Sequence, residues 1–255
     1  MEQFVQQGSI VRKIWGKADT VLFIFAGAAA EFALNKAVDW LYFTGRLPTD
    51  PLGRLFSTVS YARKIVFSNK EDALKAIDQI TAIHATVEKN RKSKIPDWAY
   101  RDVLFMLIYY SIASFELMER KMTMIEKEEV YNVFFRMGQR MNLQSLPVTY
   151  TSWLGAREHH MKNDMEKSAY TIDLYRQYKK HLGYIRYWIL LEGQVMVIPR
   201  QIKSLLGMRS FSWLMPALII YKFTRFIQLD GFVKKVILPG KYHKEFEALD
   251  VKYQE

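Results

Sequence analysis

The sequence predicts an all-α protein with a single domain, built as a helical bundle. Segments with the alternating apolar pattern of half-buried strands are scarce, whereas apolar residues recur at helical spacing and several of these runs begin with helix-capping residues. The 255 residues are enough for one domain with a sizeable core. Hydrophobic residues make up 50% of the chain and charged residues 25%, which is the balance of an ordinary folded protein.

The first buried helix is expected over residues 21–30. This stretch is apolar, follows several basic residues and ends in alanines, so it imitates a secretory signal. Asp19 interrupts that pattern, Glu31 follows immediately, and the stretch is too short to span a bilayer. We therefore expect a buried helix whose small residues allow close packing, preceded by a fraying helix over the mostly polar residues 1–18.

Two consecutive helices follow, and the first has the clearest start in the chain. Asp50 is an acidic cap and Pro51 takes the first helical position. Because residues three or four apart share a helix face, this helix carries one line made of Arg54, Thr58, Tyr61 and Ile65. The second helix, over residues 70–90, carries one stripe made of Ala73, Ile77, Ile80, His84 and Val87. His84 is therefore expected to point toward the core, either as a core histidine satisfied by its neighbours or as a metal ligand.

The middle of the chain predicts the centre of the bundle. Residues 103–115 form a nearly continuous apolar run, which is typical of a helix surrounded by other helices and falls short of a membrane span. Asp97 is the expected cap of this helix. Thr123 and Glu126 form a capping box that opens the next helix, which runs to about residue 141.

A short motif in the second half resembles a metal site by composition. His159, His160 and Asp164 lie close together in the sequence and are of metal-ligating types. They belong to a charged run over residues 157–167, however, so we interpret them as a solvated helix face.

The C-terminal part predicts a helix over residues 180–199, a break at Gly207 and an apolar stretch over residues 211–226. The large apolar residues of that stretch are Trp213, Leu214, Leu218, Ile219, Phe223 and Phe226. The basic residues beside them are Lys222, Arg225, Lys234 and Lys235. This pattern fits either interfacial attachment to an anionic membrane or a core helix with ordinary surface lysines. The tail from residue 239 is polar and charged.

Charge and cysteine content limit the classes of function. The net charge of +11, from 37 basic and 26 acidic residues, favours an anionic partner such as a membrane surface. We expect no nucleic acid, because no helix-turn-helix or basic aromatic platform stands out. The absence of cysteine excludes disulfides, thiolate-ligated haem, iron–sulfur clusters and cysteine catalysis. Without a convincing signal peptide or spanning segment, we expect a cytoplasmic protein that can associate with membranes.

Five segments of the chain together resemble the catalytic domain of the MpaB/rubber-oxygenase (latex-clearing-protein-like) family, formerly a domain of unknown function. These segments cover residues 27–31, 38–41, 50–58, 83–87 and 98–102. The most specific elements are Arg-x-x-x-Thr, at Arg54 and Thr58, and Ile-His-x-x-Val, whose His84 follows 26 residues after Thr58. The resemblance divides the chain into an N-terminal extension (1–20), the catalytic domain (21–208) and a C-terminal apolar-basic helix with a polar tail (209–255).

The resemblance implies a b-type haem in a pocket between helices, with His84 as the proximal ligand of the iron. Arg54 and Thr58 match positions that are expected on the distal side, where they would hydrogen-bond dioxygen. Apolar walls for the porphyrin are expected from Ile77, Ile80 and Phe105.

The chain departs from the family pattern at one position. The rubber-cleaving members resemble Arg-x-x-Lys-Thr, whereas Ser57 stands where the lysine would be, so we expect no lysine-capped iron. Those members also have an acidic base, for which Asp39 and Glu31 are the open candidates.

The expected function is that of an oxidoreductase, a haem b-dependent oxygenase that cleaves C=C bonds of an apolar, unsaturated, isoprenoid or lipid-like substrate with dioxygen. The alternative is a non-catalytic helical protein that binds haem or lipid and attaches peripherally to an anionic membrane.

Overall fold

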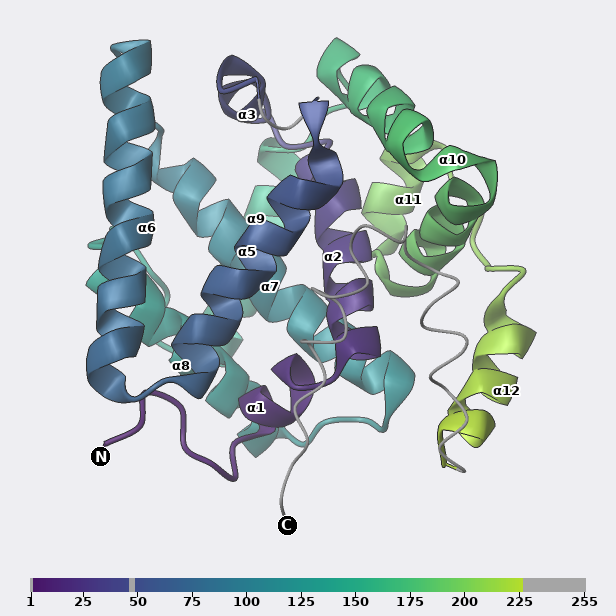
Figure 1. The fold of residues 1–255 in the computed structure, drawn as a ribbon, viewed down its shortest axis with the longest axis horizontal. Coiled ribbons are helices and arrows are strands. Elements are labelled where there is room, and N and C mark those ends of the chain that lie inside the picture. Colours follow the sequence, from purple (N-terminus) through teal and green to yellow (C-terminus); the bar gives the residue numbers. More distant parts are fainter. Residues whose placement is uncertain (1, 46–48, 227–255) are drawn as a thin grey trace.

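Two helices pack against each other at the centre of the fold: α2 (Ala18–Phe32) and α7 (Asp97–Met118) (Figure 1). α7 contains the run expected in the middle of the bundle, and most of its circumference is buried. Gly27 allows the close approach of the pair, because a Cβ at this position would overlap the ring of Tyr110. The structure, a computed structural model, describes residues 2–45 and 49–226. Apart from two isolated β-bridges, the regular elements of these residues are helices, which confirms the all-α prediction.

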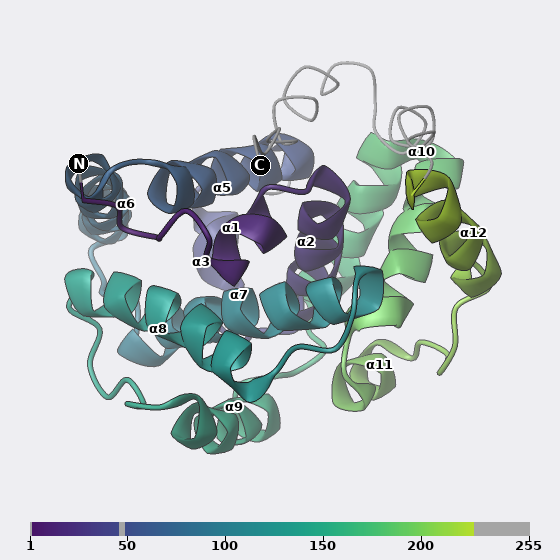
Figure 2. The ribbon, with the colours of Figure 1, turned by 90° about the horizontal axis from the view of Figure 1, so that it is seen from below.

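The other helices surround the α2–α7 pair. Their bounds are α1 (Ile10–Trp15), α3 (Asp39–Phe43), α5 (Pro51–Phe67), α6 (Lys70–Arg91), α8 (Met124–Arg140), α9 (Tyr150–Asn163), α10 (Ala169–Val197), α11 (Arg200–Leu206) and α12 (Met215–Phe226). α5 and α6 pack together on one side of the pair, whereas α10, α11 and α12 lie on the other (Figure 1). Seen from below, α8 and α9 cover a further face (Figure 2).

Capping residues place the helix starts where the sequence predicts them. The Asp50 side chain accepts a hydrogen bond from the Gly53 N–H at 3.0 Å, and Pro51 is the first residue of α5. Thr123 and Glu126 form the complete capping box of α8. Such caps satisfy backbone donors that a helix leaves open at its start, so they are readable from the local sequence alone.

Three local predictions are wrong. α1 does not fray: its apolar residues are buried where it packs against α2, α5 and α8. α10 begins at Ala169, well before the expected residue 180, and bends at Gly183, whose φ of 72° is accessible to glycine without strain. Pro96, and not Asp97, is the cap of α7.

Polar contacts attach α12 to the rest of the fold. The buried carboxylate of Glu192 in α10 accepts hydrogen bonds from Ser212 Oγ at 2.7 Å and from the Trp213 N–H at 2.8 Å, and it pairs with Arg209. Tyr221 donates to Asp19 Oδ2 at 3.1 Å. One face of α12 therefore belongs to the core.

Candidate functional site

A cavity of about 1280 Å³ is lined by residues of α2, α5, α6, α7, α10 and α12. It is larger than the roughly 300–1,000 Å³ of ordinary small-molecule pockets. Apolar and aromatic side chains make most of its wall, whereas Ser57, Thr58, His84 and Arg186 are among the polar ones. The cavity is therefore roomy enough for a bulky cofactor or a long apolar molecule.

His84 lies on the part of the cavity wall that α6 forms. Ile80 and Val87, about one turn before and after it, line the cavity too, as the predicted stripe requires. The half-buried imidazole packs edge-on against the ring of Tyr100, with 5.1 Å between the ring centroids. Tyr100 of α7 donates a hydrogen bond to Glu88 Oε1 of α6 at 3.1 Å. This bond joins the two helices beside His84 and fixes the ring on which the imidazole packs.

The adjacent helix α5 contributes the second group of predicted residues. Thr58, Tyr61 and Ile65 line the cavity together with Ser57. The backbone of Arg54 lies in α5, but its side chain is outside the described residues. The structure thus brings Thr58 and His84 to one cavity.

The predicted apolar walls are only partly correct. Ile80 lines the cavity, whereas Ile77 and Phe105 are buried in the core away from its surface. Phe105 packs edge-on against Trp153 of α9 instead, with 6.2 Å between the ring centroids. α7 faces the cavity through neighbouring positions such as Leu104 and Leu107.

The two candidate acidic bases have different surroundings. Glu31 is buried, accepts two hydrogen bonds from the guanidinium of Arg157 (2.8 and 2.6 Å) and a third from the Tyr110 hydroxyl (2.8 Å). Burial alone would raise the pKa of Glu31, but the charges of Arg157 and His160 lower it to about 2. A carboxylate that is so occupied and so acidic is a poor proton acceptor near neutral pH.

Asp39 is the more accessible of the two acids. It pairs with Arg91 at 2.6 Å, and the guanidinium of Arg91 stacks on Trp40, a residue that lines the cavity. Asp39 therefore remains a candidate base at the edge of the cavity.

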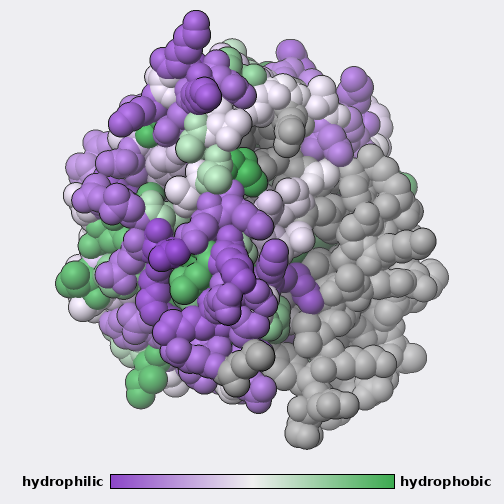
Figure 3. All heavy atoms as spheres, turned by 60° about the vertical axis from the view of Figure 1, so that its left-hand side comes forward, coloured by the Kyte–Doolittle hydropathy of each residue, from purple (hydrophilic) through white to green (hydrophobic). Residues whose placement is uncertain are grey.

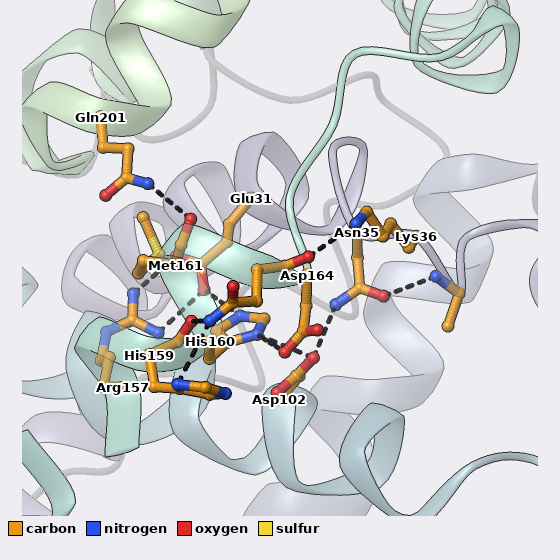
Figure 4. A network of polar contacts seen from close by, with 12 residues as sticks. Glu31, Asn35, Lys36, Asp102, Arg157, His159, His160, Met161, Asp164 and Gln201 are labelled. Atoms are coloured by element: carbon orange, nitrogen blue, oxygen red, sulfur yellow. Dashed lines mark hydrogen bonds and ion pairs between the residues drawn. The ribbon is translucent and has the colours of Figure 1, made fainter. Parts of the chain in front are cut away.

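A second polar cluster lies between α2, α7 and α9 (Figure 4). His160 Nδ1 is 2.8 Å from Asp102 Oδ2 and 3.3 Å from Asp164 Oδ2, and His160 Nε2 is 3.5 Å from Glu31 Oε1. Burial alone would lower the pKa of His160, but the carboxylates of Asp102 and Glu31 raise it to about 9.

The interpretation of this motif as a solvated helix face is wrong for His160, which is 2% exposed, and correct for its neighbour His159. The signal that identifies the buried face is helical spacing. The buried residues of α9 include Tyr150, Trp153, Arg157 and His160, which are three or four residues apart.

Comparison with known proteins gives a family match. Residues 12–228 match the family model described as "ER-bound oxygenase mpaB/B'/Rubber oxygenase, catalytic domain". No curated protein and no solved structure matches the chain. The match extends beyond the expected residues 21–208 at both ends and so includes most of α1 and all of α12.

Proposed function

The chain belongs to the family of MpaB and rubber-oxygenase catalytic domains, and on this basis we propose that it is a haem b-dependent oxygenase. Its proposed reaction is oxidative cleavage of a C=C bond in an apolar, isoprenoid or lipid-like substrate, with dioxygen as co-substrate. The observation that carries the proposal is that Thr58 and His84, the centres of the two family motifs, line one large apolar cavity.

The cavity fits the haem part of the proposal. His84 lies on a regular helix with its ring packed on Tyr100, so its imidazole would be suited to hold the haem iron. The apolar wall suits the porphyrin. Arg186 lines the cavity with a buried Nε that has no hydrogen-bond partner among the described residues, and such a cation suits an anionic group of the ligand. When bound, haem would supply the activation of dioxygen.

The extent of the cavity supports an elongated apolar substrate. Beyond α5 and α6 its wall continues along α10 and α12, through Trp188, Leu190, Ala217 and Leu218. Such walls hold an apolar chain by burial and exclude water from the reacting atoms.

Thr58 is proposed to stabilise charge that develops on oxygen during the reaction. We expect Thr58→Val, which keeps the side-chain shape and removes the hydroxyl, to lower turnover by a factor of about 10²–10³. Haem content should not change, because Thr58 is not the proposed iron ligand. The measurement is product formation from an unsaturated isoprenoid chain, normalised to the Soret absorbance.

The matched control is Ser60→Ala, an exposed position on the same helix that does not line the cavity. Full turnover of Thr58→Val would contradict the assignment. Loss of haem from this variant would make Thr58 a structural residue or a contact of the cofactor.

A second candidate function is attachment to an anionic membrane surface, with or without catalysis. Leu218 of α12 is 8% exposed and faces the core, whereas Trp213, Ile219 and Phe223 are 63%, 52% and 73% exposed. Exposed aliphatic and aromatic residues also follow the bend of α10, at Tyr184 and Ile185. By contrast, the face on which α6 lies is mainly hydrophilic (Figure 3). None of the described helices is long and apolar enough to cross a bilayer.

The exposed apolar residues of α12 and of the bend in α10 are expected to bind vesicles of anionic phospholipid at low salt and to release them as salt rises. Each basic residue near such a surface contributes about 1 kcal/mol, screened over roughly 8 Å at physiological ionic strength. The measurement is the fraction of protein that sediments with the vesicles. Phe223→Ser and Trp213→Ser should each bind fewer vesicles than the wild type. Ile125→Ser, an exposed apolar position on α8, is the control. Equal recovery in the supernatant with and without vesicles at low salt would rule the attachment out.

A further inference from the structure

Three side chains at the junction of α7 and α9 converge on one point, and they do not line the cavity of His84. They are Asp102 of α7, His160 of α9 and Asp164, which follows the end of α9, and Figure 4 shows them pointing toward one another. Their ligand atoms all lie within 4.8 Å of one another, and Nδ1 of His160 is 2.8 and 3.3 Å from the two carboxylate oxygens. Tetrahedral Zn²⁺ with bonds of about 2.0–2.2 Å places its ligand atoms on the order of 3.3 Å apart, which is similar spacing.

The contact between His160 and Glu31 determines which ring nitrogen carries the proton when the imidazole is neutral. Nε2 lies 3.5 Å from Glu31 Oε1, so in a neutral ring the proton belongs on Nε2. A metal ion that takes the place of the Nδ1 proton would find three ligand atoms on this side, Nδ1 of His160 and one carboxylate oxygen each of Asp102 and Asp164. An imidazole that ligates through one nitrogen and points the other at a carboxylate is the usual arrangement behind a metal ion.

Asp102 is itself held by a further residue. Asn35 Nδ2 donates to Asp102 Oδ2 at 3.2 Å, and Asn35 Oδ1 accepts from the Ala37 N–H at 2.8 Å. Asn35 is buried, and it links the segment after α2 to the cluster. The carboxylate is thus oriented by a hydrogen bond, as ligating carboxylates are.

The charges of the cluster are balanced by a divalent cation. The two hydrogen bonds between Arg157 and Glu31 pair one positive with one negative charge. Asp102 and Asp164 remain, and without a metal ion both face the ring of His160. A single positive charge on His160 balances only one of these two carboxylates, whereas a cation of charge +2 neutralises both.

We propose that Asp102, His160 and Asp164 bind one divalent transition-metal cation, with Zn²⁺ as the cation that suits this set of one nitrogen and two oxygens. The Asp164 side chain is 24% exposed, so the cation can enter from its side and keep a water as fourth ligand. The bound cation would tie α7 to α9 and, through Asn35, to the end of α2.

The test is a zinc titration of the full-length protein after treatment with a chelator, at neutral pH. We expect one zinc per chain by elemental analysis and a higher unfolding temperature in its presence. Asp164→Asn and His160→Ala should weaken zinc binding about tenfold or more, since each removes a ligand. His159→Ala is the matched control, because this neighbouring histidine on α9 is exposed and should leave the affinity unchanged.

Two results would overturn the metal site. Equal zinc affinity of Asp164→Asn and the wild type would place the cation elsewhere, and a wild type that takes up no zinc would make the cluster a closed hydrogen-bond network. If His160→Ala fails to fold, Asp164→Asn decides, since it conserves the size of a side chain that is partly at the surface. The titration gives the same result with and without haem, so it fails or succeeds independently of the proposed oxygenase function.

Discussion

Replacing Arg157 with methionine is expected to destabilise the fold by about 3–5 kcal/mol, because it leaves the buried carboxylate of Glu31 without its counter-charge. Methionine keeps most of the apolar volume of the arginine stem, so the loss reports the charge and not a cavity. The measurement is the free energy of unfolding from urea denaturation, followed by circular dichroism.

The double variant Arg157→Met/Glu31→Gln should recover part of this loss. The amide carries no charge and can still accept the hydrogen bond of the Tyr110 hydroxyl. The control is Lys162→Met, which removes the exposed ion pair with Glu158 on the same helix and should cost no more than about 1 kcal/mol. A double variant that is less stable than the Arg157→Met single variant would contradict the role given to the pair.

Replacing His84 with alanine is expected to abolish or greatly weaken haem binding while the helical fold persists. The substitution removes the proposed iron ligand, so only burial of the porphyrin in the apolar cavity would be left to hold the haem. The small space that it opens should cost about 1–3 kcal/mol of stability. Added imidazole should enter that space and restore part of the spectrum. The measurement is the Soret absorbance and the bound iron of each purified variant.

The other four histidines serve as comparisons for this variant. His159 is exposed, His160 lies in the second polar cluster, His181 lies on α10 and His243 is outside the described residues. His159→Ala and His181→Ala are the cleanest controls and should keep the wild-type spectrum. An unchanged spectrum of His84→Ala would assign the iron to another ligand.

Local signals in the sequence were sufficient for the elements that depend on local contacts. The Asp50 cap with Pro51, and the capping box of Thr123 and Glu126, satisfy helix ends within four residues of the chain, so their helices start as predicted. The stripe through His84 was also readable, because helical spacing alone places Ile80, His84 and Val87 on one side of α6.

The parts that the sequence did not predict depend on partners far along the chain. His160 is buried because the carboxylates that face it come from Glu31 and Asp102, which lie on α2 and α7. In the sequence, a charged run therefore looks like a solvent-exposed helix face, because the counter-charges that allow its burial lie on other helices far along the chain. The burial of α1 likewise depends on α5 and α8, and Ile77 and Phe105 face the core because neighbouring helices, and not the haem motif, decide their surroundings.

A haem titration of the wild-type protein tests most directly whether the cavity of Thr58 and His84 holds one b-type haem. We expect a Soret band that saturates at one haem per chain, with a spectrum typical of histidine ligation. If the reconstituted wild type shows no Soret band and binds no iron, the cavity serves another apolar ligand, and His84 is a core histidine that packs on Tyr100.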